Sequence, residues 1–130
     1  MYGYLYQNTD KNFTILHALD GYDEISLTCP TKTITNKTEG MIEASDFGVE
    51  TLSPLEIAGG GSIEFSAEIF LNVLKGNGTS AQQNVVCANA GMAIATAEGI
   101  SPREGFEKAK ESLVSGNALK SLQKLQELSR

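Results

Sequence analysis

The sequence is poor in the residues that bind soft metals or build disulfide scaffolds. It has a single histidine, His17, and two cysteines, Cys29 and Cys87, which lie far apart and belong to no ligand-spacing motif. We therefore expect neither a disulfide framework nor a zinc site. Both thiols are expected to be reduced, as in a cytoplasmic protein.

Long apolar runs and basic clusters are also missing. No segment approaches the roughly 18–20 apolar residues that span a bilayer. The first ten residues are polar and tyrosine-rich, without the apolar centre of a signal peptide. The formal charge is −6, and the basic residues are scattered. We therefore expect no membrane and no nucleic acid among the partners, and a cytoplasmic location.

The first 50 residues favour strands and turns within one globular domain. The 130 residues are 41% hydrophobic and 20% charged, which suits a single core. Strands are expected at 13–19, where an apolar run ends at Asp-Gly, at 31–36, where threonines alternate, and within 41–49, after a turn at 39–40. Because 13–19 is apolar throughout, we expect a central strand that is covered on both faces, and the chain offers few convincing partner strands for it.

The second half predicts four helices. Apolar residues recur at helical spacing, and glycines or a Ser-Pro capping box mark the ends, over 62–75, 80–97, 102–115 and 117–128. The second helix is apolar on nearly all sides and should be central, whereas the first should bury a stripe made of Ile63, Ala67, Phe70 and Leu74. Strands followed by helices indicate an α+β chain or a piece of a larger α/β domain.

Three carboxylates follow the first expected strand. Asp20 lies in the Asp-Gly turn, and Asp23 and Glu24 are adjacent at a bend, where both can reach one hard cation such as Mg²⁺. Ligands of α/β proteins gather at the carboxyl ends of strands, which is where this turn lies. Spacing alone favours a solvated turn and leaves a metal site as the alternative.

Other polar positions have structural interpretations. His17 lies inside the apolar run, which favours a hydrogen-bonded core histidine and leaves a general base as the alternative. Asn89 is the only strongly polar residue in the centre of its helix and is expected to bond a neighbouring backbone. The glycines at 59–61, with Ser62, precede a helix and could cradle phosphate. However, Glu64 would repel an anion there and no Walker lysine follows, so we expect a structural loop.

Five segments, in order, resemble anthranilate phosphoribosyltransferases. They are HALDGYDEISLTCPT at 17–31, SDFGV at 45–49, GGGSIEFSAEIFLNVLKGNG at 59–78, NVVCANAGMAIATA at 84–97 and EGFEKAKESLVSGNALKSLQKL at 104–125. The sequence departs from the family at Ala18 and Cys29, where many members have glycine, and at Ser66, where asparagine is common. These departures leave the acidic pair, Asp23 and Glu24, unchanged, and no role is carried onto His17 or Ser66.

The resemblance implies a fold, an activity and a site. The fold class is α/β: part of a glycosyltransferase-family domain of the nucleoside phosphorylase and phosphoribosyltransferase type, with few strands followed by about four helices. The family transfers a phosphoribosyl group from phosphoribosyl pyrophosphate to anthranilate in tryptophan biosynthesis, releasing pyrophosphate. Asp23 and Glu24 match the acidic pair that holds Mg²⁺ at the diphosphate, and Asp20 is expected to cap the turn.

The family's chains are much longer than this one. The resemblance therefore implies that 1–130 is the carboxy-terminal part of the α/β domain, without the phosphate loop, the anthranilate pocket or the helical domain that usually forms a homodimer. We expect the chain to be inactive alone and to have the missing amino-terminal half as a partner. The alternatives are a non-catalytic α+β partner-binding module and a fragment of a pyrimidine nucleoside phosphorylase-like enzyme.

Overall fold

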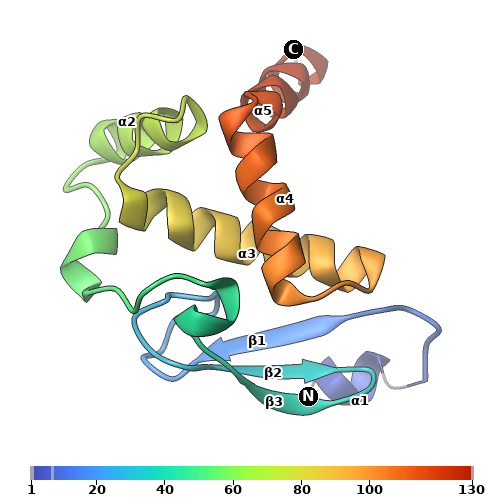
Figure 1. Cartoon of the computed structure of the whole chain (residues 1–130). Helices are drawn as coiled ribbons and strands as arrows, with labels where there is room; N and C mark the ends of the chain where they lie inside the picture. The colour runs from blue at the N-terminus through green and yellow to red at the C-terminus, as the bar shows by residue number, and fades with distance from the viewer. Residues whose placement is uncertain (1, 7, 130) are drawn as a thin grey trace.

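The computed structural model describes residues 2–6 and 8–129. A short helix precedes three strands, and four longer helices follow, as Figure 1 shows. In chain order the elements are α1 (Tyr2–Tyr6), β1 (Thr14–Ala18), β2 (Thr31–Thr35), β3 (Glu39–Ile42), the 3-10 helices η1 (Ala44–Phe47) and η2 (Pro54–Ile57), α2 (Ile63–Leu74), α3 (Ser80–Glu98), α4 (Pro102–Val114) and α5 (Asn117–Leu128). Apart from α1, which the sequence did not predict, the order of strands before helices agrees with the expectation.

The three strands form one antiparallel sheet in the order β1-β2-β3. The turn between β2 and β3 is closed by Thr35, whose N–H donates to the Thr38 carbonyl at 2.8 Å and whose hydroxyl accepts from the Thr38 N–H at 2.9 Å. Glu39 and Gly40 already belong to β3. The turn predicted at these two residues is therefore wrong, because the threonines close it earlier in the chain.

β1 is an edge strand in the part of the chain that the structure describes, since only β2 pairs with it. Leu16 and Ala18 lie on the face that α3 covers, whereas His17 lies on the opposite face, because side chains alternate along a strand. His17 is exposed, and only Ala18 is fully buried. The expectations of a strand covered on both faces and of a core histidine are therefore wrong.

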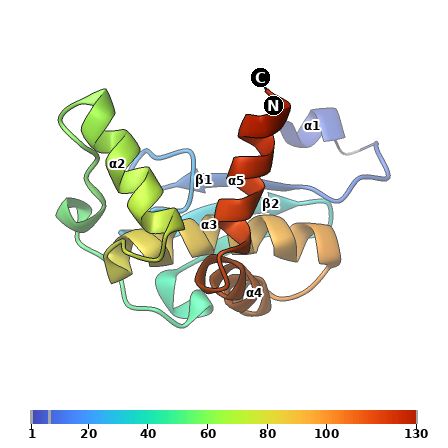
Figure 2. The same ribbon diagram turned by 90° about the horizontal axis from the view of Figure 1, so that it is seen from above.

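α3 lies over one face of the sheet, and α4 crosses α3 at close range (Figures 1 and 2). Gly91 of α3 and Gly105 of α4 meet backbone to backbone: a Cβ on Gly105 would lie 2.1 Å from the Gly91 carbonyl oxygen. This approach buries Phe106, whose ring packs against that of Phe47 with centroids 6.0 Å apart. The crossing of these helices forms the centre of the core.

The helix ends follow the sequence signals. Each of α2, α3 and α4 begins after a hydroxyl that accepts a backbone N–H three residues later, from Ser62, Thr79 and Ser101 respectively. Gly116, with φ of 76°, separates α4 from α5 at the predicted stop. Within 2–6 and 8–129, no helix combines the length and the apolarity needed to cross a membrane.

Two helices leave apolar side chains uncovered. The stripe predicted for α2 is largely exposed, with Ile63 at 85% and Phe70 at 53%, and only Val73 of this helix is buried. α3 is covered on one side, and its other side exposes Val86, Ala90, Ala93 and Ala97. The prediction of a buried α2 stripe is therefore wrong, whereas α3 is central, as expected, because it contacts both the sheet and α4. The helices form, but the described residues cover only part of their surface.

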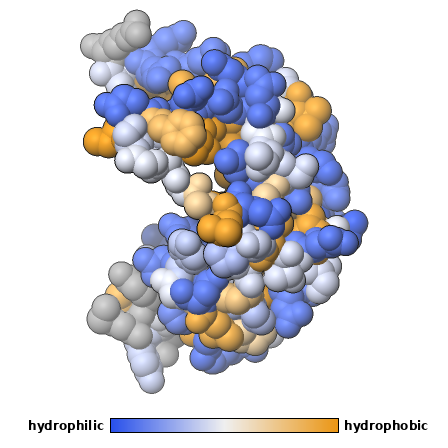
Figure 3. Space-filling view, turned by 90° about the vertical axis from the view of Figure 1, so that its left-hand side faces the viewer, coloured by the Kyte–Doolittle hydropathy of each residue, from blue (hydrophilic) through white to orange (hydrophobic). Residues whose placement is uncertain are grey.

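The surface is strongly hollowed on one side. Figure 3 shows a C-shaped profile, with a deep recess between the helical upper part of the molecule and the lower part that contains the sheet. The exposed edge of β1 and the exposed side chains of α2 belong to these two parts. The chain therefore presents an open surface rather than a closed core on this side.

Candidate functional site

The candidate site is the loop of residues 19–30, called here the acidic loop, which joins the end of β1 to the start of β2. It turns back at once, because the Ala18 N–H donates to the Tyr22 carbonyl at 3.0 Å. The bend that follows presents Asp23 and Glu24, the metal ligands predicted from the sequence, to solvent. The pair thus lies at the carboxyl end of β1, as expected.

The residues after the pair anchor the acidic loop in the core. Ile25, Ser26 and Leu27 are 2%, 3% and 1% exposed. Leu27 has φ of 60°, which is unusual for a branched side chain. Its carbonyl accepts a hydrogen bond from the Leu52 N–H at 2.9 Å. The backbone beside the pair is therefore fixed by burial, although the two carboxylates face solvent.

Asp20 caps the acidic loop from within, as the sequence predicts. Its Oδ2 accepts hydrogen bonds from the hydroxyl of Thr28 and from that of Ser26, the latter at 3.0 Å, and its N–H donates to Cys29 Sγ at 3.2 Å. These contacts, that of Thr28 foremost, hold the pKa of Asp20 below its ordinary value. Asp20 is therefore engaged inside the loop.

A side chain from α3 bonds the backbone directly after Asp23 and Glu24. Asn89 Oδ1 accepts a hydrogen bond from the Ile25 N–H at 2.9 Å, and Asn89 Nδ2 donates to the Ile25 carbonyl at 2.8 Å. The expected bond from Asn89 to a neighbouring backbone is thus confirmed. The sequence reasoning missed that this backbone belongs to the residue directly after Glu24. The one available signal was a lone polar residue in the apolar centre of the helix.

Asp23 and Glu24 suit a magnesium site that is shared with a substrate. Within the described residues, neither carboxylate has an ion-pair or hydrogen-bond partner, and no three His, Cys, Asp or Glu side chains gather into a metal-binding group. Mg²⁺ keeps several waters and usually takes one or two carboxylates together with substrate phosphates. Two available carboxylates on an anchored loop fit that arrangement and do not form a closed protein cage.

The glycine-rich segment before α2 has a structural role, as expected. Gly60 lies so close to this helix that a Cβ would be 2.6 Å from the Ser66 nitrogen. Ser62 caps the helix by accepting from the Phe65 N–H at 3.2 Å. Glu64 occupies the first turn, where backbone hydrogen bonding and the Ser62 hydroxyl lower its pKa. The helix N-terminus is therefore already occupied by its own cap and a carboxylate.

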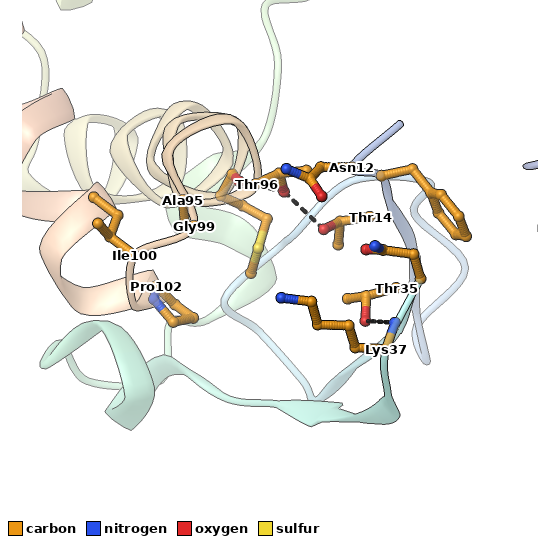
Figure 4. A pocket seen from close by; sticks show the side chains of 12 residues that line it. Asn12, Thr14, Thr35, Lys37, Ala95, Thr96, Gly99, Ile100 and Pro102 are labelled. Atoms are coloured by element: carbon orange, nitrogen blue, oxygen red, sulfur yellow. Dashed lines mark hydrogen bonds between the residues drawn. The ribbon is translucent and has the colours of Figure 1, made fainter. Parts of the chain in front are cut away.

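A cavity of about 280 Å³ opens at the other end of the sheet (Figure 4). Thr14 of β1 and Thr96 of α3 share a hydrogen bond of 2.7 Å beside it. The Lys37 side chain extends into it from the turn between β2 and β3, and none of its lining residues is acidic. An ammonium group disfavours a cation, so the acidic loop is the better candidate for a metal.

The comparisons with known proteins agree on one family. The model of the glycosyl transferase family, a/b domain, matches residues 5–119. The anthranilate phosphoribosyltransferase of Christiangramia forsetii is 68% identical over 130 residues, which is 100% of this chain and 39% of that protein. The anthranilate phosphoribosyltransferase of Cytophaga hutchinsonii is 45% identical over 95% of this chain and 38% of its own length. The chain thus spans about two-fifths of the length of these curated relatives.

Solved structures confirm the fold class. The crystal structure of anthranilate phosphoribosyltransferase from Thermus thermophilus has a TM-score of 0.78 and 25% identity over 87% of this chain and 34% of its own. The Saccharomyces cerevisiae enzyme in complex with PRPP and Mg has a TM-score of 0.73 and 28% identity over 86% of this chain and 32% of its own. The resemblance drawn from the five sequence segments is therefore confirmed.

Proposed function

The chain belongs to the glycosyl transferase family, a/b domain, and from that premise we propose that it is the carboxy-terminal part of an anthranilate phosphoribosyltransferase. Identity of 68% across the whole chain supports the proposal. The complete enzyme transfers phosphoribosyl from phosphoribosyl pyrophosphate to anthranilate, giving N-(5-phosphoribosyl)anthranilate and pyrophosphate in tryptophan biosynthesis. The observation that carries this function is the acidic pair, Asp23 and Glu24, exposed on an anchored loop with both carboxylates available.

The reaction exchanges one bond at the ribose for another. The bond from C1 to the pyrophosphate oxygen breaks, and pyrophosphate leaves with the electron pair. The amino nitrogen of anthranilate bonds to C1 and loses a proton to solvent. Bound Mg²⁺ supplies Lewis-acid stabilisation of the leaving diphosphate. Asp23 and Glu24 would hold this ion, and the anchored acidic loop keeps their backbone in place, which would lower the reorganisation needed on binding.

Removing both charges tests the metal site. In the complete enzyme, Asp23→Asn with Glu24→Gln should raise the Mg²⁺ concentration for half-maximal rate by about 100-fold or more, because losing ligands costs more than losing their supports. Steady-state rates at varied Mg²⁺ measure this. The matched control is Glu50→Gln with Glu127→Gln, which removes two exposed charges elsewhere. An unchanged Mg²⁺ dependence in the first variant would remove the proposal.

We further propose that the amino-terminal half of the enzyme covers the open surface of this chain. Proteins rarely leave a strand edge and large apolar side chains exposed. Here the edge of β1 is unpaired in the described chain, and Ile63 and Phe70 of α2 are exposed. We propose that the chain is inactive alone, because none of its segments resembles the family's phosphate loop or anthranilate pocket.

Mixing the two halves tests this partnership. Co-expression of the amino-terminal half with this chain should restore transferase activity. Ile63→Asp should prevent reconstitution, because it places a charge on the surface to be buried. Glu68→Gln, an exposed change on the same helix, should not. Product formed by this chain alone, with contaminating enzyme excluded, would contradict the proposal.

The complete enzyme is also proposed to be a cytoplasmic homodimer. Both Cys29 and Cys87 are free thiols, which is consistent with a reducing compartment. The dimer follows from the resemblance, in which the amino-terminal helical domain forms the interface. Light scattering of the complete enzyme tests it, and the mass of a single chain would contradict the dimer.

A further inference from the structure

We infer that Asn89 of α3 positions the acidic pair for its metal ion, a role that rests on the function proposed above. The side chain of Asn89 bonds Ile25 and Val85 and neither carboxylate, so it acts on the residue that follows the pair. Its side chain bonds both the N–H and the carbonyl of Ile25, at 2.9 and 2.8 Å. It therefore fixes the backbone immediately after Glu24 and is a positioning residue rather than a ligand.

The chemistry of this contact requires a carboxamide. Ile25 offers one donor and one acceptor, and the amide of Asn89 offers the complementary pair. Rotating the amide by half a turn would place Asn89 Nδ2 against the Ile25 N–H and Asn89 Oδ1 against the Ile25 carbonyl oxygen. Two donors and two acceptors would then face each other, so only the observed orientation fits. The second amide hydrogen goes to the Val85 carbonyl at 2.9 Å, which ties the side chain to its own helix. The Asn89 side chain is thus held in a single orientation.

The acidic pair lies between two anchors. Before it, the Ala18 N–H holds the Tyr22 carbonyl at 3.0 Å. After it, Asn89 holds Ile25, which is itself 2% exposed. Between these anchors, neither carboxylate forms an ion pair within the described residues.

The helix that carries Asn89 is a rigid base for the loop. α3 has 19 residues and packs backbone to backbone against α4. A bond from such a base keeps the two carboxylates near the geometry that binding requires. Without it, burial alone would hold Ile25, and the two carboxylates would lose part of their preorganisation, which weakens the affinity.

Two variants remove the contact in different ways. Asn89→Leu keeps a similar volume but makes no hydrogen bond, and Asn89→Asp keeps an acceptor but loses both donors. The matched control is Thr96→Val on the same helix, which loses a side-chain hydrogen bond to Thr14 at the far end of β1. In the complete enzyme, kcat and the Mg²⁺ concentration for half-maximal rate are measured beside thermal unfolding.

Both Asn89 variants should raise the half-saturating Mg²⁺ concentration about tenfold or more. Their kcat at saturating Mg²⁺ should approach that of the parent, and Thr96→Val should leave the Mg²⁺ dependence unchanged. Equal Mg²⁺ dependence in Asn89→Leu and Thr96→Val, or a lost kcat that added Mg²⁺ does not restore, overturns the positioning role. Because Asn89→Leu is apolar and Asn89→Asp is charged, poor folding of one variant leaves the other to test the role.

The Asp23→Asn, Glu24→Gln enzyme, assayed in parallel, separates the two proposals. If its Mg²⁺ dependence changes while the Asn89 variants behave like the parent, the positioning role fails and the metal site stands. If its Mg²⁺ dependence is also unchanged, the metal site fails and the positioning role fails with it.

Discussion

One added methyl group at Gly91 should separate α3 from α4 and disturb the acidic loop. A Cβ there would lie 2.5 Å from the Phe106 nitrogen and 2.6 Å from its Cα, whereas ordinary contact begins at 3.4 Å. Because the blocking atoms are backbone, the helices must move apart by about 1 Å. Asn89 precedes Gly91 by two residues on the same helix, so this movement also displaces the Asn89 side chain that bonds the Ile25 backbone.

Two opposing contributions set the size of the effect. Alanine is the better helix former by about 1 kcal/mol. Overpacking a filled core costs about 1–3 kcal/mol, and the upper end applies because Phe106, beside the clash, is only 2% exposed. The net loss for Gly91→Ala is therefore about 2 kcal/mol. For a chain of 130 residues this corresponds to a fall in Tm of roughly 7 °C.

Thermal unfolding followed by far-ultraviolet circular dichroism measures this loss. The matched control is Gly59→Ala, because a Cβ on Gly59 would meet no atom within 4 Å. That substitution should change stability by less than about 1 kcal/mol. If Gly91→Ala and Gly59→Ala melt at the same temperature, the two helices do not meet backbone to backbone and the reasoning is refuted.

Two further predictions concern titratable groups. The pKa of Asp20 is lowered in the folded chain, chiefly by the Thr28 hydroxyl. The contribution of Asp20 to folding stability is therefore complete above its ordinary pKa of 3.8 and is lost as the pH falls through its lowered pKa. The protection of amides in the acidic loop, relative to their intrinsic exchange rates at each pH, should fall over that range, and Asp20→Asn should abolish this pH dependence; unchanged protection would contradict the capping role. Burial raises the pKa of the Cys87 thiol, which is 3% exposed, so a thiol reagent should modify Cys87 much more slowly than Cys29 in the native protein. Equal rates would contradict the packing of Cys87 in the core.

Helix boundaries were predictable from the sequence, and burial was not. Ser101 caps α4 and Gly116 ends it, because both signals act within a few residues along the chain. Ile63 and Phe70 satisfy helical spacing but are exposed. Spacing indicates which side chains share a face of a helix, and it does not indicate whether another element covers that face.

The acidic loop also combines features that the sequence predicts with features that it does not. The turn after β1, the adjacent carboxylates of Asp23 and Glu24, and the capping by Asp20 are predictable from the sequence, because they depend on residues close together in the chain. The contact between Asn89 and Ile25 and the outward position of His17 depend instead on how the helices and the sheet pack. Contacts between distant segments depend on how whole elements pack, and that packing is set by the shapes of the faces that meet.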